Sequence, residues 1–253
     1  MAELLASFSG LGKMLDGAVL VCDVTLAVAP GDIVGLTGPI GGGKTTALRM
    51  IAGLVRPDHG SGTVLGHDVT VPLSRRMQTG YMGQRLMFNP DLTTIENLRF
   101  HADTVCLTAA VEAIERVIAA LGLGPFANQR AGSLCDGIAR RLQFATTLLH
   151  QPRLLFLDEP CSGFDGETRE LIWAVIRQTA VSGGGAVIAT NDPGELARCT
   201  SLVPFAASRA GAQTHREACD SARCQGAAGA IDQDRLASIQ AATLTALTPV
   251  NPG

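Results

Sequence analysis

Residues 38–46, with the sequence GPIGGGKTT, constrain the fold more than any other part of the chain. They match the pattern G-x-x-x-x-G-K-[ST] and directly follow the apolar run 33–36, which predicts a buried strand. Glycines let successive backbone N–H groups turn towards an oxyanion, and a helix starting near Lys44 adds the positive end of its dipole. The segment therefore predicts a phosphate-binding loop. A glycine-rich turn with a chance lysine is the alternative, and the full spacing between a strand and a helix argues against it.

Composition limits the class of protein. The 253 residues are enough for one large domain with an inserted lobe. A net charge of −3 and a pI near 5.9 give no overall basic field, which argues against nucleic acid as a partner. The seven cysteines are scattered and odd in number, which indicates reduced thiols in a cytosolic protein. No run approaches the ~20 apolar residues of a membrane span, and the first residues lack a signal-peptide pattern.

The C-terminal region leaves one alternative open. A metal site could be built from His215, Cys219 and Cys224, but no second pair with ligand spacing lies nearby. The sequence there favours an ordinary polar tail, irregular over 204–253, with the apolar spacing of a helix over 231–247.

The remaining chain alternates between strand and helix patterns. Strands over 18–21 and 24–28 predict a small antiparallel sheet, and a helix through residue 54 follows the loop. A polar break is predicted at 57–62, with short strands at 63–65 and 81–82. Residues 85–150 are predicted to be a helical lobe, with a Thr93–Glu96 capping box and helices over 111–121 and 139–149. The sheet returns with strands 154–157 and 186–189 around a helix over 167–180.

Two carboxylates follow the most apolar strand. Asp158 and Glu159 come directly after the run 154–157, at the strand end where parallel α/β sheets build their sites. A pair of solvated charges at a strand end is the alternative, and the phosphate-binding loop upstream makes it the weaker one.

Taken together, these motifs resemble the ATP-binding cassette (ABC) ATPases over about residues 8–203. Lys44 with Thr45, Gln84, LCDGIARRLQ from 134, LLFLDEP from 154, SGFD from 162 and ATND from 189 stand in that family's order and at its separations. More narrowly, GYMGQRLMFNPDLTTIENLRF, LGPFANQRAG and LLHQPRLLFLDEPCSGFD look like exporter ATPase subunits whose permease is a separate chain. They look most like the first cassette of tandem ATPases.

The resemblance implies a fold class and a domain plan. It implies an α/β P-loop NTPase core with a mixed sheet, an N-terminal antiparallel β subdomain and an inserted helical lobe at about 85–150. The nucleotide-binding domain is expected to cover residues 1–203.

The resemblance also implies ATP and Mg²⁺ as ligands. Hydrolysis of a γ-phosphate needs charge neutralisation, a metal and a positioned water. Thr45, Gln84 and Asp158 are the expected metal ligands, directly or through water. Glu159 is the expected general base, with Gln84 and Asn191 as further catalytic residues. The expected nucleotide-binding residues are Gly38, Pro39, Ile40, Gly41, Gly42, Gly43, Lys44, Thr45 and Thr46.

Three departures from the family pattern qualify this expectation. The loop that reads LSGGQ in the family, and closes on the partner cassette's ATP, here contains Cys135 and Asp136. A carboxylate ~4 Å from a phosphate repels it by about 4 kcal/mol at an effective dielectric of 20. Asn191 replaces the family's histidine and carries no transferable proton. The position of the adenine-stacking aromatic falls near Leu15, which cannot stack.

The leading hypothesis is an ATP-binding subunit of an ABC exporter with slow turnover. Its expected partners are a second cassette, with a heterodimer favoured, and a transmembrane permease that holds it at the inner face of the cell membrane. A degenerate regulatory cassette that binds nucleotide with little or no hydrolysis is the main alternative. A soluble cassette ATPase of DNA repair or translation is disfavoured by the pI and by the short helical lobe.

Overall fold

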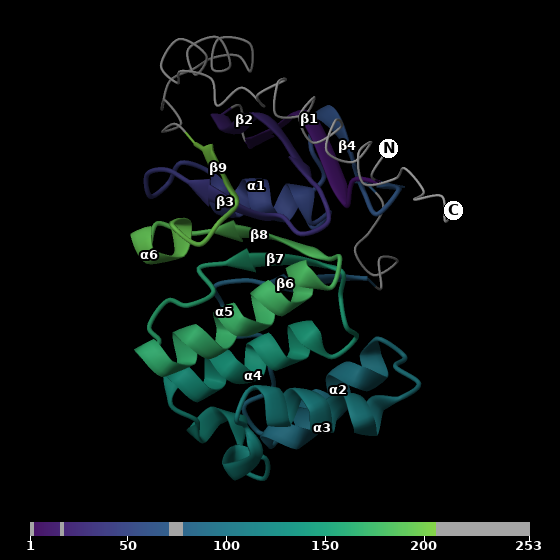
Figure 1. The fold of residues 1–253 in the computed structure, drawn as a ribbon, viewed down its shortest axis with the longest axis vertical. Coiled ribbons are helices and arrows are strands. Elements are labelled where there is room, and N and C mark those ends of the chain that lie inside the picture. The colour runs from purple at the N-terminus through teal and green to yellow at the C-terminus, as the bar shows by residue number, and fades with distance from the viewer. Residues whose placement is uncertain (1–2, 16–17, 71–77, 206–253) are drawn as a thin grey trace, which may run out of the picture.

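A computed structural model describes residues 3–15, 18–70 and 78–205, and it divides their strands into two sheets (Figure 1). The antiparallel sheet has the order β2-β1-β4-β5 and the parallel sheet has the order β6-β7-β8-β3-β9. Helix α1 lies between the sheets, α4 and α5 cover the opposite face of the parallel sheet, and α2 and α3 lie at the far end (Figure 1).

The described strands and helices lie between residues 6 and 204. The antiparallel strands are β1 (Ala6–Leu15), β2 (Ala18–Val28), β4 (His59–Val64) and β5 (His67–Asp68). The parallel strands are β3 (Ile33–Thr37), β6 (Thr79–Met82), β7 (Leu154–Asp158), β8 (Gly185–Ala189) and β9 (Ser201–Pro204). The helices are α1 (Lys44–Ile51), α2 (Thr94–Thr104), α3 (Ala110–Ala120), α4 (Asp136–Leu148), α5 (Gly166–Val181) and α6 (Pro193–Leu196).

Strand β7 shows how the core is organised. Its side chains alternate between two separate apolar clusters: Leu154 and Phe156 pack with α1 and the antiparallel sheet, whereas Leu155 and Leu157 pack with the helical lobe and α5. All four are fully buried. A strand buried on both faces is a continuous apolar run, which is why this segment was recognisable from the sequence.

The predicted fold class is confirmed: a P-loop α/β core carries an antiparallel sheet on one side and helices on the other. In the described chain the two strand directions occupy separate sheets. The capping box is confirmed as well, because the Thr93 side chain accepts from the Glu96 N–H while the Glu96 carboxylate accepts from the Thr93 N–H.

One strand was missed and two predictions about local structure were wrong. Strand β1 was not predicted, because its serines and glycines and its register shifts against β2 hide the alternation. The two strands expected over 18–28 are one strand, in which Asp23 adopts a positive φ of 52°. The polar segment 57–62, predicted to be a break, contributes four residues to β4. There Gly62 pairs with Phe8, and a Cβ on Gly62 would come within 2.4 Å of the Phe8 ring.

Two helix ends also differ from the prediction. Helix α1 ends at Ile51 rather than residue 54, because Gly53 turns into the left-handed region with a φ of 73°. Helix α4 begins at Asp136 rather than residue 139. It opens with the exposed Asp136 and with Gly137, neither of which adds to an apolar periodicity, yet Asp136 suits the positive end of a helix.

Strand β9 runs through Pro204, one residue past the predicted domain boundary. Proline is tolerated there because β9 is an edge strand of the parallel sheet, where a missing N–H removes no ladder bond on the open side. The tail from 206, including the helix predicted over 231–247 and the residues His215, Cys219 and Cys224, lies outside the described residues.

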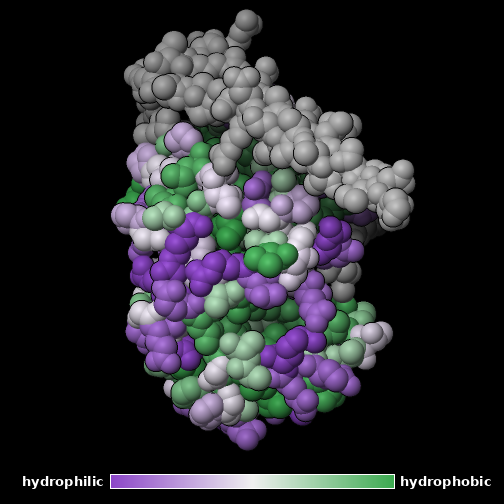
Figure 2. Space-filling view, in the orientation of Figure 1, coloured by the Kyte–Doolittle hydropathy of each residue, from purple (hydrophilic) through white to green (hydrophobic). Residues whose placement is uncertain are grey.

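The surface in Figure 2 is mixed rather than uniformly polar. Hydrophilic residues gather beside α6 (Figure 2). Two ion pairs link residues of α5 to residues next to α6: Arg169 with Asp192, and Glu170 with Arg198. Apolar residues are interspersed among polar ones over α4 and α5. Of the helices that the structure describes, none combines the length and the hydrophobicity that crossing a bilayer requires.

Replacing Gly60 by alanine should destabilise the protein more than the same change at Gly66. Both glycines have a positive φ, 81° and 77°, so alanine costs about 1–2 kcal/mol at either site. At Gly60 the new Cβ would also lie 2.4 Å from the Gly10 carbonyl oxygen, whereas at Gly66 no atom lies within 4 Å. We expect urea unfolding to show a loss of roughly 3 kcal/mol for Gly60→Ala and about 1 kcal/mol for Gly66→Ala. Equal losses would contradict the close packing of β4 on β1.

Candidate functional site

The loop between β3 and α1 is shaped by glycines. Gly38, Gly41 and Gly43 have positive φ values of 147°, 79° and 88°. A Cβ on Gly43 would lie 2.6 Å from Val21 Cγ2 and 2.7 Å from the Leu20 carbonyl oxygen, so glycine is required at the N-cap of α1. The loop consequently wraps around the positive end of that helix, as an oxyanion site requires.

Lys44 lies over this loop. Its Nζ donates to the carbonyl oxygens of Gly38, at 2.8 Å, and Pro39, at 3.0 Å. The side chain is largely buried, with 8% of its surface exposed. No carboxylate within the described residues forms an ion pair with it. The ammonium is therefore held beside the loop by backbone carbonyls and not by an ion pair.

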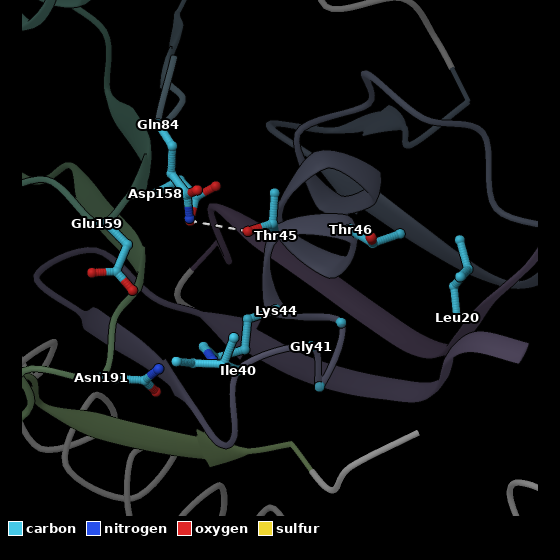
Figure 3. Close-up of a pocket in the computed structure, with 12 residues that line it drawn as sticks. Leu20, Ile40, Gly41, Lys44, Thr45, Thr46, Gln84, Asp158, Glu159 and Asn191 are labelled. Carbon is cyan, nitrogen blue, oxygen red and sulfur yellow. Dashed lines mark hydrogen bonds between the residues drawn. The ribbon is translucent and has the colours of Figure 1, made fainter. Parts of the chain in front are cut away.

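Asp158 brings three segments together at the end of β7 (Figure 3). Its Oδ1 accepts from Thr45 Oγ1 at the start of α1 and from Gln84 Nε2 just after β6, each at 3.2 Å. The residue is 1% exposed, and its Oδ2 has no hydrogen-bond partner in the described part of the chain. Burial raises the pKa of Asp158, and the bonds from Thr45 and Gln84 oppose that rise.

Glu159 directly follows Asp158 in the chain, and its side chain points to a different side of the cleft (Figure 3). Its φ of 52° lies in the left-handed region, a conformation that costs a non-glycine residue about 1–3 kcal/mol. The backbone holds it there, because its N–H donates to the Ala189 carbonyl at 2.8 Å. Burial raises the pKa of Glu159, and the negative charges of Glu195 and Asp158 raise it further. A carboxylate with a raised pKa is a stronger base than a solvated one.

Asn191 is exposed and lies between two anchored residues. The Thr190 hydroxyl bonds to the buried Glu195 carboxylate and accepts from the Asp192 N–H at 3.1 Å. The Asp192 carboxylate pairs with Arg169 at 2.8 Å, which lowers the pKa of Asp192. These contacts fix the backbone on both sides of Asn191.

One cleft of about 250 Å³ unites the predicted residues (Figure 3). Gly38 and Pro39 are absent from the lining and contribute the carbonyls that hold Lys44. The lining consists of Leu20, Ile40, Gly41, Gly42, Gly43, Lys44, Thr45, Thr46, Gln84, Asp158, Glu159 and Asn191.

Sequence reasoning missed three contributors to this region. Leu20 lines the cleft from β2, whereas Leu15, where a stacking aromatic was sought, is 56% exposed at the end of β1. Glu195 is buried beside the Asn191 loop. Arg140 bonds to the backbone of both Gln84 and Glu159. The spacing of Arg140 and Gln143 on one face of a helix was the available sign.

Cys135 and Asp136 occupy a separate place. Cys135 is the extended N-cap residue of α4 and Asp136 lies in the first turn; both are exposed and neither lines the cleft. The charge of Asp136 is therefore presented to solvent and not to the chain's own site.

The donor set fits a magnesium nucleotide. Mg²⁺ is usually held by one or two protein oxygens together with phosphate oxygens and waters. The unpartnered Oδ2 of Asp158 and the Thr45 hydroxyl beside it supply such oxygens. Among the described residues no three His, Cys, Asp or Glu side chains cluster to hold a metal by themselves.

Comparison with known proteins identifies relatives along most of the chain. A family model described as ABC transporter matches residues 21–162. The probable multidrug ABC transporter ATP-binding protein YbhF of Escherichia coli is 35% identical over 210 residues, which cover 80% of this chain and 36% of that protein. The cytochrome c biogenesis ATP-binding export protein CcmA of Cupriavidus necator is 34% identical over 184 residues, covering 72% of this chain and 81% of that protein.

Other relatives are longer than the matched region. The daunorubicin/doxorubicin resistance ATP-binding protein DrrA of Streptomyces peucetius is 35% identical over 185 residues, covering 72% of this chain and 56% of that protein. The chain therefore spans about a third of the length of YbhF and about half that of DrrA.

Solved structures support the fold. One described as the ATP binding subunit of an ABC transporter has a TM-score of 0.74 at 23% identity and covers 82% of this chain and 88% of its own. A dimeric post-hydrolysis state of the ATP-binding cassette MJ0796, bound to ADP and Pi, has a TM-score of 0.72 at 21% identity and covers 81% and 97%.

Replacing Asp158 by asparagine should stabilise the ligand-free protein. Burial raises the pKa of Asp158 above its unfolded value, so the fold favours the protonated form and the charged form lowers the free energy of unfolding at neutral pH. Asparagine removes the charge and keeps an oxygen for Thr45 and Gln84. We expect the free energy of unfolding in urea to rise by about 1 kcal/mol at pH 7.5.

The pH dependence provides the control. The penalty of the charged form is fully present above the folded pKa of Asp158 and disappears as the pH falls towards the unfolded value of about 3.9, so the gain from Asp158→Asn should shrink on acidification. Asp91→Asn, at an exposed position, should change stability little at either pH. A less stable Asp158→Asn protein at pH 7.5 would contradict the buried, poorly compensated charge.

Proposed function

We propose that the chain is a transporter subunit that couples Mg-ATP binding and hydrolysis to a separate membrane permease. This follows from its family, because the chain belongs to the ABC transporter family of ATP-binding proteins. The observation that carries this proposal is that Thr45, Gln84 and Asp158 meet in the cleft that Lys44 also lines. Glu159 directly follows Asp158 and lines the same cleft. Export is the direction we assign, since the names of several relatives refer to export or drug resistance.

Lys44 and the loop bind the polyphosphate in this proposal. The Lys44 ammonium leaves the carbonyls of Gly38 and Pro39 for the β- and γ-phosphate oxygens, and the glycine N–H groups at the start of α1 face the same charge. Thr45, Asp158 and, through its amide oxygen, Gln84 hold Mg²⁺ directly or through water. Bound Mg²⁺ supplies charge neutralisation at the phosphate oxygens.

Glu159 serves as the general base. It lies one residue beyond the metal carboxylate, and its left-handed backbone turns the side chain to the other side of the cleft. Its raised pKa suits acceptance of a proton from the attacking water. Asn191 donates a hydrogen bond near the γ-phosphate but provides no charge, so turnover is slower than with a histidine there.

The partner in this proposal is a different cassette. Asp136 is exposed in the first turn of α4, the surface expected to close on a partner's nucleotide. In a homodimer both sites would face such a carboxylate, whereas a heterodimer confines the repulsion to one site. We place the cassette in residues 1–203, like the first cassette of a tandem ATPase, at the inner face of the cell membrane through the permease.

The second candidate function is a regulatory cassette that binds nucleotide with little hydrolysis. Cys135, Asp136 and Asn191 favour it. The intact group of Lys44 and Asp158 with Glu159 favours hydrolysis instead, because a site used only for binding has no need of a positioned base.

Lys44→Ala should abolish Mg-ATP binding, because it removes the cation of the loop. Isothermal titration calorimetry with the purified protein measures this directly. Arg177→Ala is the control, since Arg177 is an exposed cation of α5 that does not line the cleft, and its loss should leave the affinity unchanged. Unchanged affinity in Lys44→Ala would refute the site assignment.

Glu159→Gln should retain Mg-ATP binding and lose turnover by at least 100-fold, the usual contribution of a general base. Steady-state phosphate release, measured alone and with a competent cassette partner, tests this and separates the two candidate functions. No phosphate release by the wild type in either setting would favour the regulatory cassette. Turnover that survives in Glu159→Gln would exclude Glu159 as the base.

Neutralising Asp136 should promote ATP-dependent self-association. The Glu159→Gln substitution prevents turnover, so the test uses this background with Mg-ATP. There Asp136→Asn should lower the dimer dissociation constant at least tenfold, as measured by analytical ultracentrifugation. That factor corresponds to about 1.4 kcal/mol, well within the repulsion of two nearby charges. Glu167→Gln, which neutralises an exposed first-turn carboxylate of α5, is the control and should have no effect. Tight self-association with Asp136 intact would contradict the heterodimer preference.

A further inference from the structure

Arg140 connects α4 to both sides of the cleft. Its Nη1 donates to the carbonyl oxygens of Gly83, at 3.2 Å, and Gln84, at 2.8 Å. Its Nη2 donates to the carbonyl oxygen of Glu159 at 3.1 Å. One half-buried guanidinium thus bonds to the backbone of the segment after β6 and to the backbone after β7.

Gln143, one turn further along α4, completes the contact. It is 4% exposed, and its Nε2 donates to the carbonyl oxygens of Gly83 at 3.0 Å and Arg85 at 2.6 Å. The two side chains therefore hold three consecutive carbonyls around Gln84. A planar guanidinium with several donors in fixed directions is suited to such a task, whereas a lysine ammonium is a single point charge.

Two of the three carbonyls that Arg140 holds belong to Gln84 and Glu159, whose side chains line the cleft. Gln84 donates through its side chain to Asp158 Oδ1. Glu159 adopts its left-handed backbone with its carbonyl shared between Arg140 and the Ser162 N–H, at 3.2 Å. Any movement of α4 along its axis must therefore move the Gln84 segment or break these bonds.

The same contacts can also carry a movement from the cleft to α4. Arg140 lies about one turn from the N-terminus of α4, where Cys135 and Asp136 are exposed. A ligand that draws Gln84 towards the cleft pulls on the first turns of α4 through the guanidinium. The apolar side of α4 packs inside the helical lobe, through Ile138 and Leu142, so the lobe follows the helix.

We propose that Arg140 is a positioning residue that transmits the nucleotide state of the cleft from Gln84 and Glu159 to the N-terminus of α4. The inference rests on the proposed function, in that the cleft must bind Mg-ATP. It adds a route by which the chain's own site controls the surface offered to a partner cassette. A brace that only stabilises the fold is the competing explanation, and it predicts no response to nucleotide.

Hydrogen–deuterium exchange of the full chain, with and without saturating Mg-ATP, tests the transmission. In the wild type, Mg-ATP should slow exchange in peptides covering 38–46, 83–85 and 135–140. In Arg140→Ala the affinity for Mg-ATP should stay within threefold and the protection of 38–46 should persist. Protection of 135–140 should fall below half of the wild-type value.

Two further variants complete the design. Arg140→Lys should behave like Arg140→Ala, because Nη1 and Nη2 bond to different segments and the single nitrogen of an ammonium cannot take both positions. Arg177→Ala, which removes an exposed arginine of α5, should match the wild type. If Arg140→Ala does not fold, Arg140→Lys decides; if neither folds, Arg140 is a structural brace and the proposal is wrong.

The outcomes separate the inference from the proposed function. A wild type that binds no Mg-ATP overturns the proposed function and the transmission with it. A wild type that binds Mg-ATP without any change over 135–140 overturns the transmission alone. The same result follows if both Arg140 variants bind nucleotide and keep full protection of 135–140.

Discussion

The architecture of the site depends on one buried carboxylate. Asp158 stands at the end of β7, between β6 and β8, and accepts bonds from the start of α1 and from the segment after β6. A charge at 1% exposure is costly unless it is fully hydrogen-bonded, and only one of its two oxygens has partners among the described residues. Because these bonds join segments distant in sequence, the position of the phosphate-binding loop relative to Gln84 follows from this residue.

The parallel sheet separates two apolar cores, and the site lies where both end. One core contains α1 and the antiparallel sheet, and the other contains α5 and the helical lobe. The faces of β7 contribute to different cores, and polar contacts at the strand ends join the segments around the cleft. The bonds from Arg140 and Gln143 to the Gln84 segment are of this kind.

Sequence patterns predicted those parts of the structure in which one physical requirement dominates. The loop at 38–46, the strand at Asp158 and the capping box at Thr93 each depend on local residue types, and the structure has them where they were expected. Strand β1 was missed because cross-strand pairing, and not its own alternation, specifies it. Arg140 and Glu195 were missed as parts of the site region because their roles come from segments that are near only in space. The spacing of Arg140 and Gln143 marks a polar face of a helix, but it does not identify the carbonyls that this face contacts.

The contrast between the two surfaces of the chain bears on whether the cassette hydrolyses ATP. Cys135 and Asp136 are exposed, so a change there disturbs no packing and says little about this chain's own site. Asp158 is different, because its charged form destabilises the ligand-free fold and an asparagine would accept the same two hydrogen bonds. What asparagine cannot supply is a negative oxygen for a divalent cation. The buried charge therefore favours a site that works with Mg²⁺ over one that only holds a nucleotide, and Glu159, held in a costly backbone conformation beside it, favours hydrolysis for the same reason.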